Sequence, residues 1–142
     1  MTTTPRHSVA VAGVTVREDG RILVVQRRDN GRWEAPGGVL EQDETFEHGV
    51  QREIAEETGV TVAVESLSGV YKNMKIGVVA LVYRCRPVSG EATPTEESQR
   101  VEWLTVDEIQ QRMMPAYAVR VLDALTAGPC SRAHNGTTVI EL

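Results

Sequence analysis

The chain has 142 residues, of which 41% are hydrophobic and 25% charged, and its formal net charge is −5. This length fits one domain over residues 1–142, with a core that needs no disulfide or structural metal. The acidic balance argues against binding to a nucleic-acid polymer, which requires clustered lysines and arginines. No apolar run approaches the ~20 residues that cross a bilayer, so no membrane association is expected.

Cysteine usage and the N-terminal residues indicate the compartment. Cys85 and Cys130 form no CxxC pair and are expected to be reduced thiols. The first residues lack the apolar segment of a signal peptide. We therefore expect a cytoplasmic protein, and a homodimer is compatible with its apolar strands.

The predicted elements alternate between strands and helices. In chain order, the patterns predict strands over 7–17, 21–27 and 33–35, a helix over 45–58, strands over 60–64, 67–71, 76–86 and 101–104, a helix that begins at Thr105, and a helix over 115–125. The turn at 18–20 predicts that the first two strands form a hairpin. Residues 1–7 and 128–142 are expected to be flexible or peripheral, although TTVIEL could add a strand. This order is typical of an α/β or α+β sandwich with a mixed sheet.

Three glutamates share one stripe of the first predicted helix. A helix turns about 100° per residue, which places Glu53, Glu56 and Glu57 within an arc of roughly 100°, beside the apolar Val50 and Ile54. Like charges at these spacings destabilise a helix by a few tenths of a kcal/mol per pair, on the order of 0.2–0.5. The stripe therefore needs an explanation.

Two explanations fit the stripe. The first is a solvated acidic face, in which Arg52 pairs with Glu56 four residues on. The second is a hard divalent cation, because clustered carboxylate oxygens suit Mg²⁺ or Mn²⁺. The preceding Pro36-Gly37-Gly38 turn favours the second, since backbone without side chains lets a metal or ligand approach closely.

The stretch Gly38–Val60 resembles the Nudix box. The positions that match its pattern are Gly38, Glu44, Arg52, Glu53, Ile54, Glu56, Glu57, Gly59 and Val60. The lead-in RILVVQRRDNGRWEAPGG and the later VEWLTVDEI are also similar to this family, so the resemblance to a MutT-like single-domain Nudix hydrolase covers roughly residues 8–110.

The resemblance implies a Nudix-type α/β/α sandwich and Mg²⁺-dependent hydrolysis of a nucleoside diphosphate linked to a group X. It implies that Glu53, Glu56 and Glu57 are metal ligands, assisted by a backbone carbonyl at Gly37 or Gly38. Mn²⁺ is an alternative cation.

Other residues take roles around these ligands. The resemblance implies that Arg52 orients a carboxylate and that Glu44 braces the loop-helix unit or reaches the metals through water. Arg27 ends a strand near the site, where it either holds a phosphate or forms a plain salt bridge. The expected substrate-binding residues are thus Arg27, Gly37, Gly38 and Glu44.

The general base remains open among four glutamates. A carboxylate must accept a proton from the attacking water. Glu53 and Glu57 can do this, and so can Glu97 or Glu96 in the loop before the late strand. Glu97 is favoured over Glu96 by its distance along the chain from Trp103, and two solvated loop charges are the alternative.

The substrate is expected to be a small nucleotide. Downstream of the box we find no mark of a specialised subfamily, which favours a MutT-like enzyme on nucleoside triphosphates. The alternatives are a hydrolase of ADP-ribose, a nucleotide sugar or a dinucleoside polyphosphate, and a Nudix-fold binding module without catalysis. An isomerase of the same fold would need a catalytic cysteine, and neither Cys85 nor Cys130 is placed for that role.

Overall fold

The computed structural model describes residues 3–141, which form nine strands and three helices in two sheets with helices on both sides. The elements in chain order are β1 (Ser8–Thr15), β2 (Ile22–Arg27), β3 (Trp33–Glu34), β4 (Gly37–Val39), α1 (Phe46–Thr58), β5 (Thr61–Asn73), β6 (Val78–Ser89), β7 (Ser98–Leu104), α2 (Val106–Arg112), α3 (Pro115–Ala124), β8 (Cys130–His134) and β9 (Val139–Ile140). None of the helices in this range is both long and apolar enough to cross a bilayer.

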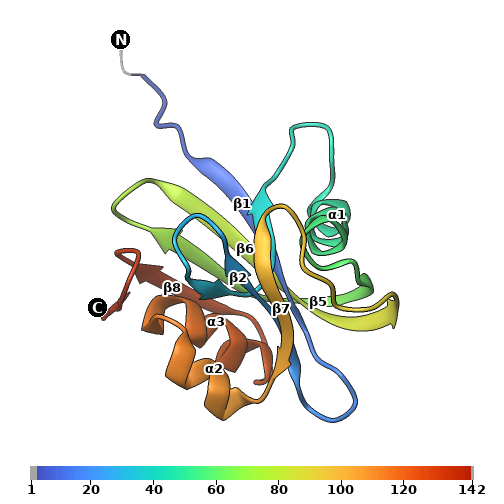
Figure 1. The fold of residues 1–142 in the computed structure, drawn as a ribbon. Helices are drawn as coiled ribbons and strands as arrows, with labels where there is room; N and C mark the ends of the chain where they lie inside the picture. The colour runs from blue at the N-terminus through green and yellow to red at the C-terminus, as the bar shows by residue number, and fades with distance from the viewer. Residues whose placement is uncertain (1–2, 142) are drawn as a thin grey trace.

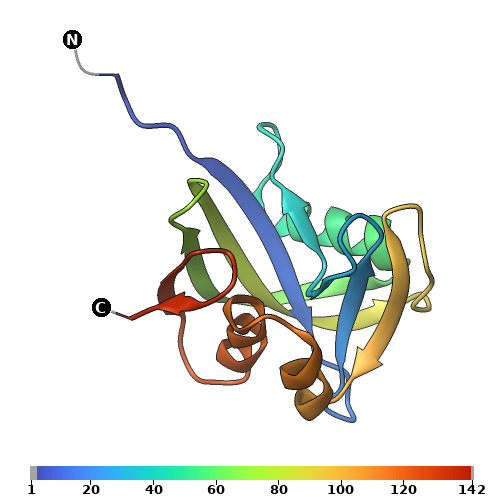
Figure 2. The ribbon, with the colours of Figure 1, turned by 60° about the vertical axis from the view of Figure 1, so that its left-hand side comes forward.

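The larger sheet is mixed and lies between α1 and α3 (Figure 1). Its six strands follow the order β4-β1-β6-β5-β8-β9, with β1 parallel to β6 and β5 parallel to β8. A second sheet has the order β3-β2-β7, and Figure 2 shows it beside α2 at a steep angle to the larger sheet. The expected α/β sandwich with a mixed sheet is confirmed.

Alternation along β1 explains why helices cover both faces of the sheet. Successive side chains of a strand point to opposite faces. Val11 packs in the core cluster that contains Val50 and Ile54 of α1, whereas Ala12 and Val14 pack in the cluster on the α3 side. One strand thus supplies both cores, which is why the sequence 8–15 is apolar at nearly every position.

Helix α1 begins and ends where its sequence predicts. The Thr45 side chain accepts a hydrogen bond from the His48 backbone N–H at 3.2 Å, which caps the N-terminus. At the other end Gly59 adopts a left-handed conformation with φ of 78°, which favours glycine. These caps fix the rotation and the length of the helix that carries the box glutamates. The predicted helix start at Thr105 is confirmed as well, since Thr105 and Glu108 form a capping box at the start of α2.

The predicted hairpin between the first two strands is wrong. Their pairing is limited to the bridge Val16–Ile22 and the turn beside it, where the Arg17 N–H donates to the Arg21 carbonyl at 2.9 Å. Strand β2 then pairs with β3 and β7 in the second sheet. All four residues from Ile22 to Val25 are buried, so β2 needs a covered face on each side. Strand β2 is covered on both faces because it lies between the two core clusters, with Ile22 and Val24 in one and Leu23 and Val25 in the other.

The segment after α3 joins the larger sheet. Strand β8 pairs in parallel with Gly69–Asn73 of β5, and β9 pairs with β8. His134 at the end of β8 is 1% exposed. The tail that was expected to be flexible or peripheral therefore forms one edge of the sheet, and the strand considered for TTVIEL is present as β9. The two strand pieces predicted over 60–64 and 67–71 are one irregular strand, β5.

Candidate metal and substrate site

Three carboxylates meet at the side of α1 that faces the loop before β7. Glu53, Glu57 and Glu97 each offer an oxygen atom, and these three atoms lie within 4.8 Å of one another. The two helix residues are buried, while Glu97 comes from the exposed loop. The structure therefore places Glu97 in the acidic cluster, and Glu96 lines the same hollow without being one of the three.

The side chain of Glu57 is the most strongly perturbed acid of the cluster. Its Oε2 accepts a hydrogen bond from the Gly37 backbone N–H at 2.7 Å. Burial, followed by the nearby charge of Glu53, raises the pKa of Glu57 to about 8, and this hydrogen bond offsets only part of the shift. Glu53 shows the same direction, because burial raises its pKa too. The cluster therefore holds like charges closely, in a setting that a cation would stabilise.

Gly38 leaves the space that the carboxylate of Glu53 occupies. A Cβ at this position would lie 2.6 Å from Glu53 Oε1, closer than a side-chain carbon can approach. Strand β4 pairs antiparallel with β1 through Gly37, Gly38 and Val39. The extended glycine backbone thus lies directly against the acidic face of α1.

Arg52 ties the loop before α1 to the helix. Its Nη2 and Nε donate to the two carboxylate oxygens of Glu44 at 2.6 and 2.9 Å, and Glu44 Oε1 also accepts from the Glu41 backbone N–H at 2.9 Å. The pair with Arg52 lowers the pKa of Glu44 to about 2. Arg52 Nη1 also lies 3.0 Å from Glu53 Oε1. One guanidinium therefore fixes the loop and orients a carboxylate of the cluster.

Glu56 lies outside the cluster of three. Its side chain is 55% exposed, and its nearest charged partner is Arg52, with 3.3 Å between Oε2 and Nη1. Helix α1 carries the predicted stripe of three glutamates. Its packing against the sheet buries Glu53 and Glu57 and leaves the side chain of Glu56 in solvent. This position matches the pairing of Arg52 with Glu56 that was the first of the two explanations for the stripe.

A hollow of about 490 Å³ opens in front of the cluster. Its lining combines acidic and basic side chains: Glu53, Glu57, Glu97, Arg27 and Arg28. Arg27 donates to both oxygens of Asp29 at 2.9 and 2.7 Å and lies 3.6 Å from Glu34. The structure thus shows the salt bridge that was the alternative for Arg27, at the edge of a hollow where a phosphate would lie.

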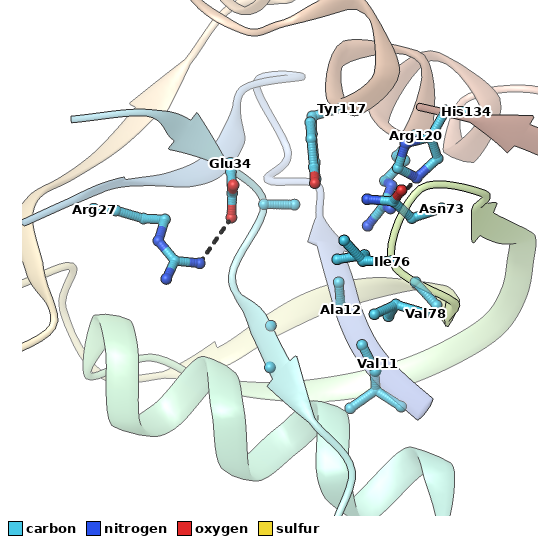
Figure 3. A pocket seen from close by; sticks show the side chains of 15 residues that line it. Val11, Ala12, Arg27, Glu34, Asn73, Ile76, Val78, Tyr117, Arg120 and His134 are labelled. Carbon is cyan, nitrogen blue, oxygen red and sulfur yellow. Dashed lines mark hydrogen bonds and ion pairs between the residues drawn. The ribbon is translucent and has the colours of Figure 1, made fainter. Parts of the chain in front are cut away.

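A second, smaller hollow lies on the other side of β4 (Figure 3). It measures about 160 Å³ and shares Arg27, Gly37 and Gly38 with the first. Sequence reasoning missed its polar residues, which come from four separate elements: Glu34, Asn73, Tyr117, Arg120 and His134. No short motif links positions so far apart. The only local signal was an arginine, Arg120, within the apolar pattern of α3.

The donor set of the cluster fits a hard divalent cation. All three groups are carboxylates, which Mg²⁺ and Mn²⁺ prefer, and no histidine or cysteine is among them. The adjacent backbone of Gly38 carries no side chain that would block its approach. Glu53, Glu57 and Glu97 would hold the ion between α1 and the loop before β7.

Comparisons with known proteins agree with this geometry. Residues 6–125 match the model of the NUDIX domain. A MutT-like protein of Streptomyces ambofaciens is 58% identical over 140 residues, which cover 98% of this chain and 91% of that protein. An ADP-ribose pyrophosphatase of Methanocaldococcus jannaschii is 33% identical over 109 residues, covering 72% of this chain and 64% of that protein.

A solved structure shares the fold. The crystal structure of a NUDIX hydrolase from Nitrosomonas europaea superposes with a TM-score of 0.79 and 20% identity, over 93% of this chain and 82% of that one. The family model spans most of the chain and the Streptomyces relative nearly all of it. This chain is therefore a MutT-like member of the Nudix family, a hydrolase that acts on phosphoric anhydrides.

Proposed function

We propose that the protein is a Mg²⁺-dependent pyrophosphohydrolase that cleaves a nucleoside diphosphate linked to a group X, with nucleoside triphosphates as the first candidates. The observation that supports this most is the approach of Glu53, Glu57 and Glu97 within 4.8 Å, at the edge of a hollow that also holds Arg27. Carboxylates would hold the cation, and the arginine would contact the phosphates.

The residues divide the chemistry between them. A bound divalent cation neutralises the charge that develops on the phosphate oxygens and lowers the pKa of coordinated water. Glu53, Glu57 and Glu97 would hold the cation, Arg52 would orient Glu53, and a carboxylate of this group would accept the proton of the attacking water. Glu97 suits the role of base because it comes from an exposed loop, whereas Glu57 is engaged by the Gly37 N–H.

The group X has two main candidates. The MutT-like relative spans nearly the whole chain, which favours a nucleoside triphosphate. The archaeal relative is named an ADP-ribose pyrophosphatase, which keeps ADP-ribose as the alternative. Nucleotide sugars and dinucleoside polyphosphates belong in the same test, because their scissile group is the same diphosphate.

The test is turnover of a nucleotide panel with Mg²⁺, Mn²⁺ or EDTA. The panel contains the (d)NTPs, oxidised dGTP, ADP-ribose, nucleotide sugars and dinucleoside polyphosphates. Metal-dependent turnover that Glu57→Gln lowers at least ~100-fold supports the proposal. The matched control is Glu47→Gln, which changes a glutamate of the same helix outside the cluster and keeps the wild-type rate. A folded protein that turns over no compound of the panel would overturn it.

A further inference from the structure

The Glu97 carboxylate reaches the acidic cluster from a loop without regular structure. This loop connects β6 and β7 and passes the end of α1, where the Thr93 N–H donates to the Thr58 carbonyl at 2.9 Å (Figure 1). Glu97 is exposed, and in the part of the chain that the structure describes no basic side chain comes within salt-bridge distance of its carboxylate. Its place beside Glu53 and Glu57 therefore depends on how the backbone of the loop is held.

A tight turn contains Glu97. The Thr95 N–H donates to the Ser98 carbonyl at 3.0 Å, which closes the turn 95–98. The Thr95 hydroxyl oxygen accepts from the backbone N–H groups of Glu97 and Ser98 at 3.3 and 3.2 Å. The turn thus fixes its own two ends to each other. A contact that holds this turn in place therefore also fixes the backbone of Glu97.

Arg28 contacts this turn at two points. Its backbone N–H donates to the Glu97 carbonyl at 3.2 Å, and its side-chain Nε donates to the Thr95 carbonyl at 3.0 Å. Arg28 directly follows β2, so both bonds connect the turn to the end of a buried strand. The side chain adds a second point of attachment to the backbone bond, which restricts rotation of the turn about that bond.

Regular pairing of the strands ends just before this contact. Gln26 lies opposite Arg100 and Arg27 opposite Ser98, so Gln99 has no partner in the β2–β7 ladder. A bulge of this kind bends the strand and redirects the chain beside it. The sheet therefore sets the course of β7 only as far as Ser98, and the attachment of the residues before it falls to the bonds from the next residue of the β2 segment.

We propose that Arg28 is a positioning residue for Glu97: its Nε and its backbone N–H hold the turn 95–98, and the turn keeps the Glu97 carboxylate at the acidic cluster. This inference rests on the proposed function, because that function gives Glu97 its role at the metal. Arg28 also lines the hollow in front of the cluster, where its charge would instead contact a phosphate. The two roles use different parts of the side chain, the Nε donor for the turn and the positive charge for a phosphate.

Three substitutions of Arg28 separate the donor from the charge. Arg28→Gln places an amide nitrogen donor as many bonds from the Cα as the arginine Nε and removes the charge. Arg28→Lys keeps the charge but has a methylene group at that position. Arg28→Met has neither the donor nor the charge. The control is Arg100→Met, because Arg100 is an exposed arginine of β7 that lies outside the hollow.

The first measurement is amide hydrogen exchange at Thr95 and Ser98, followed by NMR without substrate. We expect Arg28→Met and Arg28→Lys to accelerate exchange at both amides about tenfold, because the side-chain bond to the turn is lost. Arg28→Gln and Arg100→Met should stay within about twofold of the wild type, and the buried amides of β2 should not change in any variant. Wild-type exchange in Arg28→Met would overturn the proposal. This measurement needs no turnover, so it tests the proposal even if the nucleotide panel yields no substrate.

The second measurement is the rate of hydrolysis of the substrate that the panel identifies. Arg28→Met and Arg28→Lys should lower kcat about tenfold with KM within about twofold of the wild type, whereas Arg28→Gln should retain most of the rate. In a Glu97→Gln background, Arg28→Met should lower kcat no further, because Arg28 acts through Glu97. A further loss in that background would overturn the proposal. So would a wild-type kcat in Arg28→Met, or a rate that Arg28→Lys keeps and Arg28→Gln loses, which would assign the residue to the phosphates.

Discussion

Two consecutive glycines determine how closely the acidic cluster lies against the sheet. A Cβ at Gly37 would lie 2.6 Å from the Cβ of Ala12, and one at Gly38 would lie 2.6 Å from Glu53 Oε1. Neither residue has a positive φ, so the requirement at both positions is space and not backbone conformation. The same two residues border both hollows, and a side chain there would narrow each of them.

Gly38→Ala is expected to weaken metal binding while it leaves the free energy of unfolding nearly unchanged. The added methyl group must displace the Glu53 carboxylate, which is the end of a flexible side chain, so the free energy of unfolding should change by less than about 1 kcal/mol. A shift of one ligand by about 1 Å should weaken Mn²⁺ binding and lower turnover by ~10-fold or more. Titration of Mn²⁺ followed by electron paramagnetic resonance, with urea unfolding of the same samples, measures both. Unchanged Mn²⁺ affinity would show that Glu53 does not depend on this space.

The sequence predicted the residues of the acidic cluster better than those of the second hollow. Spacing within one helix places Glu53 and Glu57 together, and the distance to Trp103 favoured Glu97 over Glu96. Arg120 and Asn73 line the same hollow only because α3 packs against β5. Such a contact depends on the order of the strands, which no local pattern in the chain encodes.

At the scale of elements, caps were predictable and pairing was not. Thr45, Gly59 and the Thr105–Glu108 capping box act within one turn of the chain, so their residue types are sufficient. The partner of β2 depends on burial on both of its faces, and here the turn at 18–20 ends in a single bridge before the strands diverge. The assignment to a second sheet is therefore a property of the packed molecule.

A partly buried ionic network holds β8 against α3. Arg132 of β8 donates to Asp123 at 2.7 and 2.8 Å, and the Tyr71 hydroxyl donates to the same carboxylate at 2.7 Å. Burial alone would raise the pKa of Asp123, but the bonds from Arg132 and Tyr71 outweigh it and leave this pKa below its ordinary value. The network thus joins the last strands to the centre of the sheet.

We expect Asp123→Asn to destabilise the protein in a pH-dependent way. Because the folded-state pKa lies below the unfolded value of about 3.9, the carboxylate stabilises the fold above that pH, and this contribution is lost as the pH falls below about 4. The loss in the free energy of unfolding should be about 2 kcal/mol at neutral pH and should shrink in acid. Urea unfolding from pH 7 to pH 3 measures it. Tyr71→Phe, which retains the Arg132 pair, is the control, and a loss that is constant with pH would contradict the expectation.

Across the whole molecule, the net negative charge and the acidic cluster both add electrostatic repulsion to the folded state. The chain carries a net charge of −5, and its acidic cluster adds a local repulsion between three carboxylates that the fold holds together. Function therefore limits stability here, since an apolar or neutral residue at Glu57 would relieve the repulsion. The nature of the fold followed from the composition and the box, whereas the second hollow is lined by residues from distant parts of the chain and exists only in the packed molecule.

Mg²⁺ is expected to raise the melting temperature. A cation that binds only the folded state stabilises it by RT ln(1 + [L]/Kd), which is about 2.7 kcal/mol at one hundred times Kd. For a domain of this size that corresponds to a shift of roughly 5–10 °C. Differential scanning calorimetry with MgCl₂ gives the total shift in melting temperature. The same measurement with NaCl at equal ionic strength gives the part due to ionic strength, and the difference is the part due to Mg²⁺ binding. Glu53→Gln combined with Glu57→Gln should melt higher without Mg²⁺ and respond little to it. A wild-type protein that responds equally to both salts would contradict a metal at this cluster.

The parallel pairing of β8 with β5 also has a consequence for synthesis of the chain. Residues Gly69–Asn73 leave the ribosome some sixty residues before their partners Cys130–His134. During that interval β5 is the edge of the nascent sheet, and its backbone groups are open to pairing with another chain. Truncation or stalling before β8 would leave this edge permanently uncovered. The last strands to be translated therefore also protect the earlier ones from aggregation.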